Sequence, residues 1–210
     1  MAGDRRGSYR NGIRTRDQIV ATAMTAFAER GFHGLSMRQL AAEVGISPAA
    51  LRRHFESKDD LLTTVLLEAW QRETTSVQVA SGRELAGLGL WTTLTAVMDY
   101  HAEHPGLLRL FVRLAAEATS PEHPAHERMA ARYRQSIDGF ASGLMVAAEE
   151  GAIGPLTADR AESEARAIAA FMDGIEIQWL LDPSFDMTRE LAGYLDTTLA
   201  RLRAEPEPVA

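Results

Sequence analysis

The 210-residue sequence predicts an all-α fold of about nine helices. Apolar residues recur at the i, i+3, i+4 and i+7 spacing of amphipathic helices, and prolines and glycines fall between the helical segments. No segment shows a convincing strand-like alternation. The length permits one or two domains with a substantial core. Because the chain contains no cysteine, disulfides, thiolate metal sites and cysteine nucleophiles are excluded.

The first elements are a polar tail and one helix. Residues 1–12 contain three arginines and three glycines besides other polar residues, and we expect them to be a disordered basic tail. Thr15 and Gln18 form a capping box that predicts the start of the first helix, and Gly31 ends it. The apolar face of this helix is predicted to carry Ile19, Ala23, Ala26 and Phe27.

Two short helices joined by a tight turn follow. Ser36 and Gln39 form a second capping box, so a helix begins at Met37, and Gly45 is placed to end it. Ser47 then caps another helix, whose first residue is a proline that needs no N–H donor there. The contacts between the two helices are predicted to come from Leu40, Ala41, Val44, Ile46, Leu51 and Phe55. This pattern is typical of a helix-turn-helix.

Charge indicates what this end of the chain binds. Residues 1–58 hold ten Lys and Arg against five acidic residues, a net of +5, so residues 59–210 carry −12 of the total of −7. A basic end beside an acidic body favours nucleic acid as the partner of the basic end. A short, braced helix that exposes Arg52, Arg53 and His54 suits the major groove of DNA. The tail arginines either follow the DNA backbone or remain solvated.

The residues predicted to contact DNA therefore lie at the starts of the two short helices and along the second. They are Ser36, Met37, Arg38, Ser47, Pro48, Ala49, Ala50, Arg52, Arg53, His54 and Lys58. We expect the cationic members to contact phosphates or base edges and the alanine methyls to allow close approach to thymine.

The rest of the chain predicts a larger helical domain. Ser57 caps a long helix from Lys58 to about Val79, and five further helices are predicted at 83–103, 106–119, 124–150, 158–181 and 187–204. Prolines near the end predict a disordered tail over residues 205–210. The expected domains are a DNA-binding domain at 13–58 and a ligand-binding and dimerisation domain at 59–204.

Residues 13–58 resemble the DNA-binding domain of TetR-family transcriptional regulators. The resemblance lies in the run Leu51–Lys58 (LRRHFESK), in AFAERGF at 26–32 and in AAEVGIS at 41–47. The family motif ends Leu-Tyr-x-x-Phe-x-x-Lys, so Arg52 replaces a tyrosine that ordinarily touches a phosphate, and Ala49 replaces a glycine. Arg52 is expected either to keep the phosphate contact or to reach a base edge, which leaves the operator sequence open.

The segment 171–183 (FMDGIEIQWLLDP) resembles the penultimate helix of the same family, in which the last two helices of each subunit form a four-helix interface. The resemblance implies a homodimer bound to a palindromic operator. The interface residues expected here are Ile168, Met172, Ile175, Trp179, Leu191, Tyr194, Leu195 and Leu199. The alternative is that these residues form only the core of one protomer.

The resemblance also implies a repressor that a small, largely apolar effector releases from DNA. Candidate pocket residues are Trp91, Met98, Phe111, Tyr133, Phe140, Phe171 and Trp179, although helical spacing alone makes each of them equally a core residue. The identity of the effector and the choice between repressor and activator remain open.

Other classes of function have less support. The pairs His101/His104 and His123/His126 have a spacing that a metal site can use, but their prolines and helix ends favour exposed turn residues, and no metal or cofactor is expected. No catalytic motif is present, so we expect no enzyme; a ligand-independent architectural DNA-binding protein is the other alternative. With no apolar run of membrane-spanning length and no secretory signal, a cytoplasmic location without membrane contact is expected.

Overall fold

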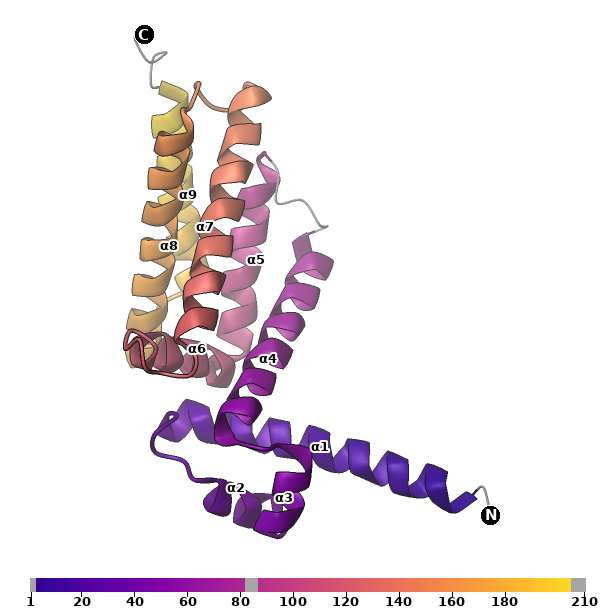
Figure 1. The fold of residues 1–210 in the computed structure, drawn as a ribbon. Coiled ribbons are helices and arrows are strands. Elements are labelled where there is room, and N and C mark those ends of the chain that lie inside the picture. Colours follow the sequence, from indigo (N-terminus) through magenta and orange to yellow (C-terminus); the bar gives the residue numbers. More distant parts are fainter. Residues whose placement is uncertain (1–2, 82–86, 205–210) are drawn as a thin grey trace. The chain divides into compact units, whose positions relative to one another are not determined.

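A computed structural model of the chain describes residues 3–81 and 87–204 and confirms the all-α prediction. The described residues form nine helices and no strand (Figure 1). The helices are α1 (Gly3–Arg30), α2 (Met37–Val44), α3 (Pro48–His54), α4 (Lys58–Ser81), α5 (Gly89–Glu103), α6 (Pro105–Glu117), α7 (His126–Glu149), α8 (Ala158–Leu181) and α9 (Met187–Ala204).

Most of the predicted boundaries agree with the structure because caps and breakers set them locally. Helices α2, α3, α8 and α9 begin and end within a residue or so of their predicted limits. The predicted tail at 205–210 and the predicted helical residues 83–86 lie outside the described residues. The first helix begins earlier than predicted, since α1 begins at Gly3 and runs through the supposed cap at Thr15. The disorder predicted for residues 1–12 stays a prediction. No proline interrupts this segment, so nothing forces the helix to start at Thr15.

The chain divides into two compact units, and the division differs from the predicted boundary at residue 58. The first unit comprises the residues up to 71 together with 109–127. The second comprises 72–108 and the residues from 128 onward. Helices α4 and α6 each cross the division, because it falls after residue 71 in α4 and after residue 108 in α6.

In the first unit, α2 packs against both α1 and α3. The core of this unit consists of apolar side chains with almost no exposed surface, namely Ile19, Val20, Phe27, Leu40, Leu51, Phe55, Leu61 and Leu62. Burying a side chain of this size contributes about 1.5–3 kcal/mol relative to leaving it exposed. The first unit therefore has a hydrophobic core of its own, which fixes the orientation of the short helix α3.

In the second unit, α9 packs against α5 and α8. Figure 1 shows α5, α7, α8 and α9 running along one another. Leu94 and Met98 of α5, Ile168 of α8, and Leu191 and Leu195 of α9 are all buried. The second unit is thus a helical bundle with an apolar core of its own.

The last turns of α6 are fixed to the end of α1 within the first unit. The Glu117 carboxylate accepts a hydrogen bond from the backbone N–H of Phe32 at 2.9 Å, and the Arg113 guanidinium donates to the backbone carbonyl of Glu29 at 2.5 Å. Gly31 lies between these contacts with φ +72°, and a Cβ atom at this position would collide with the Glu117 carboxylate. Glycine is required here for both its backbone conformation and the close approach of α6.

Replacing Gly31 with alanine is expected to destabilise the protein more than the same change at Gly45. Gly45 has a similar φ of +78° but no atom within 4 Å of the added Cβ, so Gly45→Ala reports only backbone strain of about 1 kcal/mol. Gly31→Ala should lower the free energy of unfolding by about 1 kcal/mol more, because the Glu117 contact with Phe32 is also lost. Urea unfolding of both variants measures the difference, and equal losses would show that the α6 contact contributes nothing.

Candidate nucleic-acid interface

The helix-turn-helix is fixed by three local devices. The Ser36 hydroxyl accepts from Gln39 N at 3.2 Å while the Gln39 side chain accepts from Ser36 N at 2.9 Å, so the predicted capping box is present. Gly45 then ends α2 in the left-handed conformation, where its N–H and that of Ile46 donate back to the last turn of the helix. Ser47 caps α3 through a 3.1 Å bond from Ala50 N. These bonds set the angle between the two helices before any tertiary contact is counted.

All eleven residues predicted to contact DNA belong to the first unit and lie on this motif or at the start of α4. Ser36, Arg38, Ser47, Pro48, Ala49, Arg52 and Arg53 are exposed, whereas Met37, Ala50, His54 and Lys58 are half-buried. The opposite side of α3 is the buried Leu51, and Phe55 closes the helix. Helix α3 therefore presents its arginines outward on a rigid apolar base.

Lys58 also has a structural contact that the sequence did not reveal. Its ammonium donates to the backbone carbonyl of Phe32 at 2.9 Å and to that of Leu35 at 3.0 Å. The same nitrogen lies 4.1 Å from the centroid of the Phe32 ring, in a cation–π arrangement. Lys58 thus fixes the loop before α2 to the first residue of α4, and its predicted DNA contact stays a prediction.

Two other arginines of the first unit are paired with acids. Arg30 of α1 binds Glu43 of α2 through both guanidinium nitrogens, at 2.7 and 2.8 Å. This hydrogen bond raises the pKa of Arg30 and lowers that of Glu43. Arg16 lies 3.3 Å from Glu68 and stacks over the Phe55 ring. Arg30 and Arg16 therefore stabilise the unit itself. Arg38, Arg52 and Arg53 are the exposed cations of the helix-turn-helix.

Comparison with known proteins explains this arrangement. Residues 19–65 match the family model for bacterial regulatory proteins of the TetR family, and residues 90–204 match the model for the C-terminal domain of BetI-type transcriptional repressors. The second match covers more than half of the chain. The chain belongs to the TetR family of transcriptional regulators. It is thus a DNA-binding regulator with a helix-turn-helix, as the sequence predicted.

Solved structures of this family share the fold. A TetR transcriptional regulator from Chloroflexus aurantiacus matches with a TM-score of 0.77 at 22% identity, covering 91% of this chain and 97% of that one. A TetR-family regulator from Streptomyces coelicolor gives 0.75 at 23% identity, covering 90% and 96%. A TetR transcription regulator from Haloarcula marismortui gives 0.74 at 17% identity, covering 90% and 98%. At these identities the likeness concerns the fold alone.

The seven residues predicted for an effector pocket do not form one group. Phe111 belongs to the first unit of this TetR-family regulator, and the other six belong to the second. Met98 is fully buried, the Trp91 indole donates to the carbonyl of Leu195 at 3.1 Å, and the Phe171 ring stacks on Tyr194 with 4.1 Å between centroids. Trp91, Met98 and Phe171 therefore pack within the bundle. Phe140 and Trp179 are half-buried.

Tyr133 lines a hollow of about 280 Å³ between α7 and α8. The hollow is also lined by Arg134, Ile137, Asp138, Arg166, Ala169, Ala170 and Asp173. The Tyr133 hydroxyl donates to Asp173 at 3.1 Å. Burial, the charge of Asp173 and this hydrogen bond raise the pKa of Tyr133, and burial raises the pKa of Asp173. The lining is mixed in polarity, unlike the apolar pocket expected from the sequence.

The residues predicted for the dimer interface differ in their burial within one protomer. Ile168, Met172, Ile175, Leu191 and Leu195 are buried within a single protomer, while Trp179, Tyr194 and Leu199 are half-buried. A helix that is apolar on two faces leaves its orientation undecided in the sequence, and the large side chains turned inward. The outer face of α8 carries small and exposed residues instead, among them Ala167, Ala170, Ile177 and Leu181.

The paired histidines have partners within the chain. His104 bonds the carbonyl of Tyr100, and His126 bonds that of Ala118, each at 2.8 Å. His123 accepts from Ala125 N at 3.1 Å, and burial lowers its pKa. Among the described residues, no group of three or more His, Asp or Glu side chains is arranged to hold a metal ion. Nor does any described helix combine the length and apolar content that a membrane span requires.

One group of polar residues escaped the sequence analysis. Glu73, His101, Arg132 and Glu176 come from four different helices and meet inside the second unit. Their spacing in the chain follows no motif. The one sequence signal was the pair of glutamates, each on an otherwise apolar helix face. That the four side chains contact one another is visible only in the folded structure.

Lys58→Met is expected to lower the free energy of unfolding by about 2 kcal/mol or more, because two backbone carbonyls lose a charged donor while the aliphatic chain is retained. Urea unfolding measures the loss. Arg53→Met is the matched control, since Arg53 is exposed and its replacement should change stability by less than about 0.5 kcal/mol. Equal stabilities of the two variants would contradict the structural role of Lys58.

Proposed function

We propose that this TetR-family regulator is a homodimeric repressor that binds a palindromic operator and is released by a small-molecule effector. The observation that carries the DNA half is the rigid helix α3, whose exposed Arg52 and Arg53 stand on the buried Leu51. Arg38 adds a third exposed cation on α2. Cations of this kind neutralise phosphates or bind guanine edges, and the caps at Ser36 and Ser47 hold them in register.

Dimerisation is supported by the outer faces of the last two helices. On α8, Ala167, Ala170 and Ile177 are exposed, and Leu181 is 82% exposed. On α9, small residues such as Gly193 and Ala200 are exposed. Small side chains let helices of two protomers approach closely, and the exposed leucine and isoleucine supply apolar area for burial. A two-fold dimer would carry two α3 helices, and these must lie about 34–36 Å apart to enter successive major grooves of DNA.

Release by an effector is supported by the continuity of α4 and α6 across the two units. We infer that a small molecule bound in the second unit shifts these helices and so changes the spacing of the reading helices. Such coupling between two sites is typically about 1–3 kcal/mol. It requires an effector that prefers the spacing unable to bind DNA, because equal affinity for both states shifts nothing.

The operator is found by selecting bound fragments from random duplex DNA, followed by measurement of affinity at several salt concentrations. A regulator selects a two-fold symmetric sequence and retains it against non-specific competitor DNA, whereas an architectural protein does not. Binding should weaken steeply with salt as condensed counterions are released. Failure to enrich any sequence, or affinity that is insensitive to salt, would contradict the proposal.

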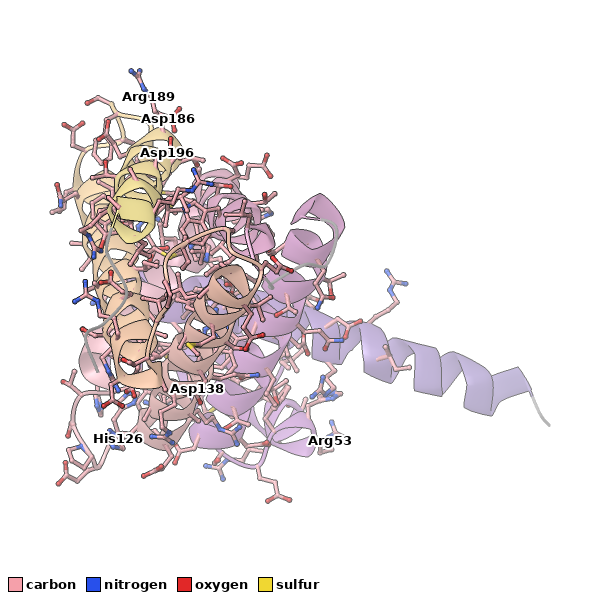
Figure 2. The ribbon with its side chains drawn as sticks, turned by 90° about the horizontal axis from the view of Figure 1, so that it is seen from above. Arg53, His126, Asp138, Asp186, Arg189 and Asp196 are labelled. Atoms are coloured by element: carbon pink, nitrogen blue, oxygen red, sulfur yellow. The ribbon has the colours of Figure 1, made fainter. Side chains whose placement is uncertain are left out.

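Arg52→Ala and Arg53→Ala are each expected to weaken operator binding. Loss of a phosphate contact should lower the salt slope by about 1, while loss of a base contact should relax sequence preference at one position by about 1–3 kcal/mol. Fluorescence anisotropy at three salt concentrations separates the two. Arg189→Ala is the control, since this exposed arginine extends away from α9 (Figure 2). If both α3 variants match the control, α3 is not the reading helix.

Ala170→Glu is expected to convert the dimer into a monomer at micromolar concentration, because it introduces a charge into the proposed α8 surface. Light scattering after gel filtration measures the mass. Ala131→Glu on α7 is the control, since Ala131 is likewise exposed. A wild-type protein that is monomeric, or an Ala170→Glu protein that remains dimeric, would place the interface elsewhere or remove it.

A further inference from the structure

Four charged side chains meet inside the second unit, and we refer to them as the buried cluster. The Glu73 carboxylate of α4 accepts from the Arg132 guanidinium of α7 at 2.6 and 2.7 Å. His101 of α5 bonds Glu176 of α8 through Nδ1 at 2.7 Å, and its Nε2 lies 3.7 Å from the Glu73 carboxylate. His101 therefore stands between two carboxylates that belong to different helices.

Three members of the buried cluster lie in the interior of the unit, and the fourth, Arg132, is half-buried. Glu73 and His101 are each 5% exposed and Glu176 is 7% exposed. Charges taken out of water are stabilised only when they are paired and balanced. With His101 protonated, the two carboxylates face two cations and the buried cluster is neutral. With His101 neutral, the two carboxylates of the buried cluster share Arg132 as the one cation among its four members.

The electrostatics of His101 follow from these neighbours. Burial by itself lowers the pKa of His101, but the hydrogen bond to Glu176 and the charges of Glu176 and Glu73 outweigh burial and the opposing charge of Arg132, so the pKa is raised above its usual value. A raised pKa means that protonated His101 stabilises the fold. This stabilisation is fully present below about pH 6.5, the usual histidine value, and is lost as the pH rises through the raised pKa.

Other titratable groups surround the buried cluster on each helix. On α5, Tyr100 has a pKa raised by burial and by the charge of Glu73. On α7 and α8, the hydrogen-bonded pair Tyr133 and Asp173 lies next to Arg132 and Glu176, and the charge of Glu176 adds to burial in raising the pKa of Asp173. The raised pKa values of Tyr100 and Tyr133 keep their protons in place near neutrality. His101 is the histidine of the buried cluster and carries its exchangeable positive charge.

We propose that the buried cluster, when His101 is protonated, anchors the second-unit end of α4 to α5, α7 and α8. Operator affinity therefore falls as the pH rises above neutrality. Glu73 lies two residues beyond the point at which α4 passes from the first unit to the second. When His101 loses its proton, the excess negative charge weakens the hold on Glu73. A loosened α4 holds the reading helix less firmly, and DNA binding then includes the cost of ordering it.

The inference rests on the proposed function for its DNA readout but has an independent stability readout. Urea unfolding of the full-length wild type is expected to show a lower midpoint at pH 8.5 than at pH 6.0. In Glu176→Gln the difference should shrink, because neutral His101 then leaves no excess charge, and His101→Gln should abolish the His101 contribution. His104→Gln is the control, since His104 is exposed and lies three residues away.

Operator affinity is measured on the duplex selected from random DNA, at one fixed salt concentration. His54 lies on α3 among the residues proposed to contact DNA, so all measurements are made in the His54→Gln background. The dissociation constant is expected to rise by about fivefold or more between pH 6.0 and 8.5. The rise should disappear when His101→Gln or Glu176→Gln is added and persist when His104→Gln is added.

The outcomes are distinguishable. A pH dependence of stability that is the same in His101→Gln as in wild type overturns the proposal that protonated His101 anchors α4. If stability depends on pH through His101 but operator affinity does not change with pH, the buried cluster is purely structural. That result overturns the regulatory inference alone. If no duplex is selected at all, the proposed function fails instead, and the unfolding data still decide whether His101 controls the buried cluster.

Discussion

The contact on which the DNA-binding unit depends is the one made by its single lysine. Lys58 is the first residue of α4, and its ammonium holds the carbonyls of Phe32 and Leu35 in the loop before α2. The loop between α1 and α2 also buries the side chains of Phe32 and Leu35, and the ammonium satisfies the backbone carbonyls of the same two residues. With the loop fixed, the capping box at Ser36 has a defined position, and α2 and α3 follow from it. One cation thereby joins the start of the connecting helix to the start of the motif that reads DNA.

A second constraint lies at the other end of this loop. Gly31 ends α1, and α6 approaches it closely enough for Arg113 and Glu117 to bond the backbone of Glu29 and Phe32. The loop from Gly31 to Leu35 is thus held from α6 at one end and from α4 at the other. These are the same two helices that continue into the second unit. Any change in the second unit that moves either helix acts on the loop that precedes the reading motif.

The sequence predicted the parts of this molecule that local chemistry determines. Ser36, Gly45 and Ser47 each set a helix end through bonds to residues three or four positions away, so their roles were legible without the fold. The reach of Lys58 to Phe32 and the meeting of Glu73 with Arg132 and His101 depend on distant segments, and no periodicity encodes them.

Helix orientation is also not determined by local chemistry. The helix 158–181 was predicted to the residue, but because both of its faces are apolar, the sequence did not show that Ile168 and Met172 are buried within one protomer. Their place in a dimer interface stays a prediction. The start of α1 failed for a related reason, since a capping box at Thr15 is only an option when the preceding residues can themselves be helical. Competition between equally permitted local structures is settled by the rest of the protein.

Helices α4 and α6 each continue from one unit into the other, and this limits how the domains of such regulators can be exchanged. Residues 109–127 belong to the DNA-binding unit although they lie far along the chain. A hybrid protein made by joining the first 58 residues to a foreign sensor domain would therefore receive another protein's α6 against Gly31. Exchange of DNA specificity between relatives is expected to succeed only when residues 109–127 are transferred together with the rest of the DNA-binding unit. The alternative is a donor protein whose α6 ends with a compatible carboxylate and guanidinium.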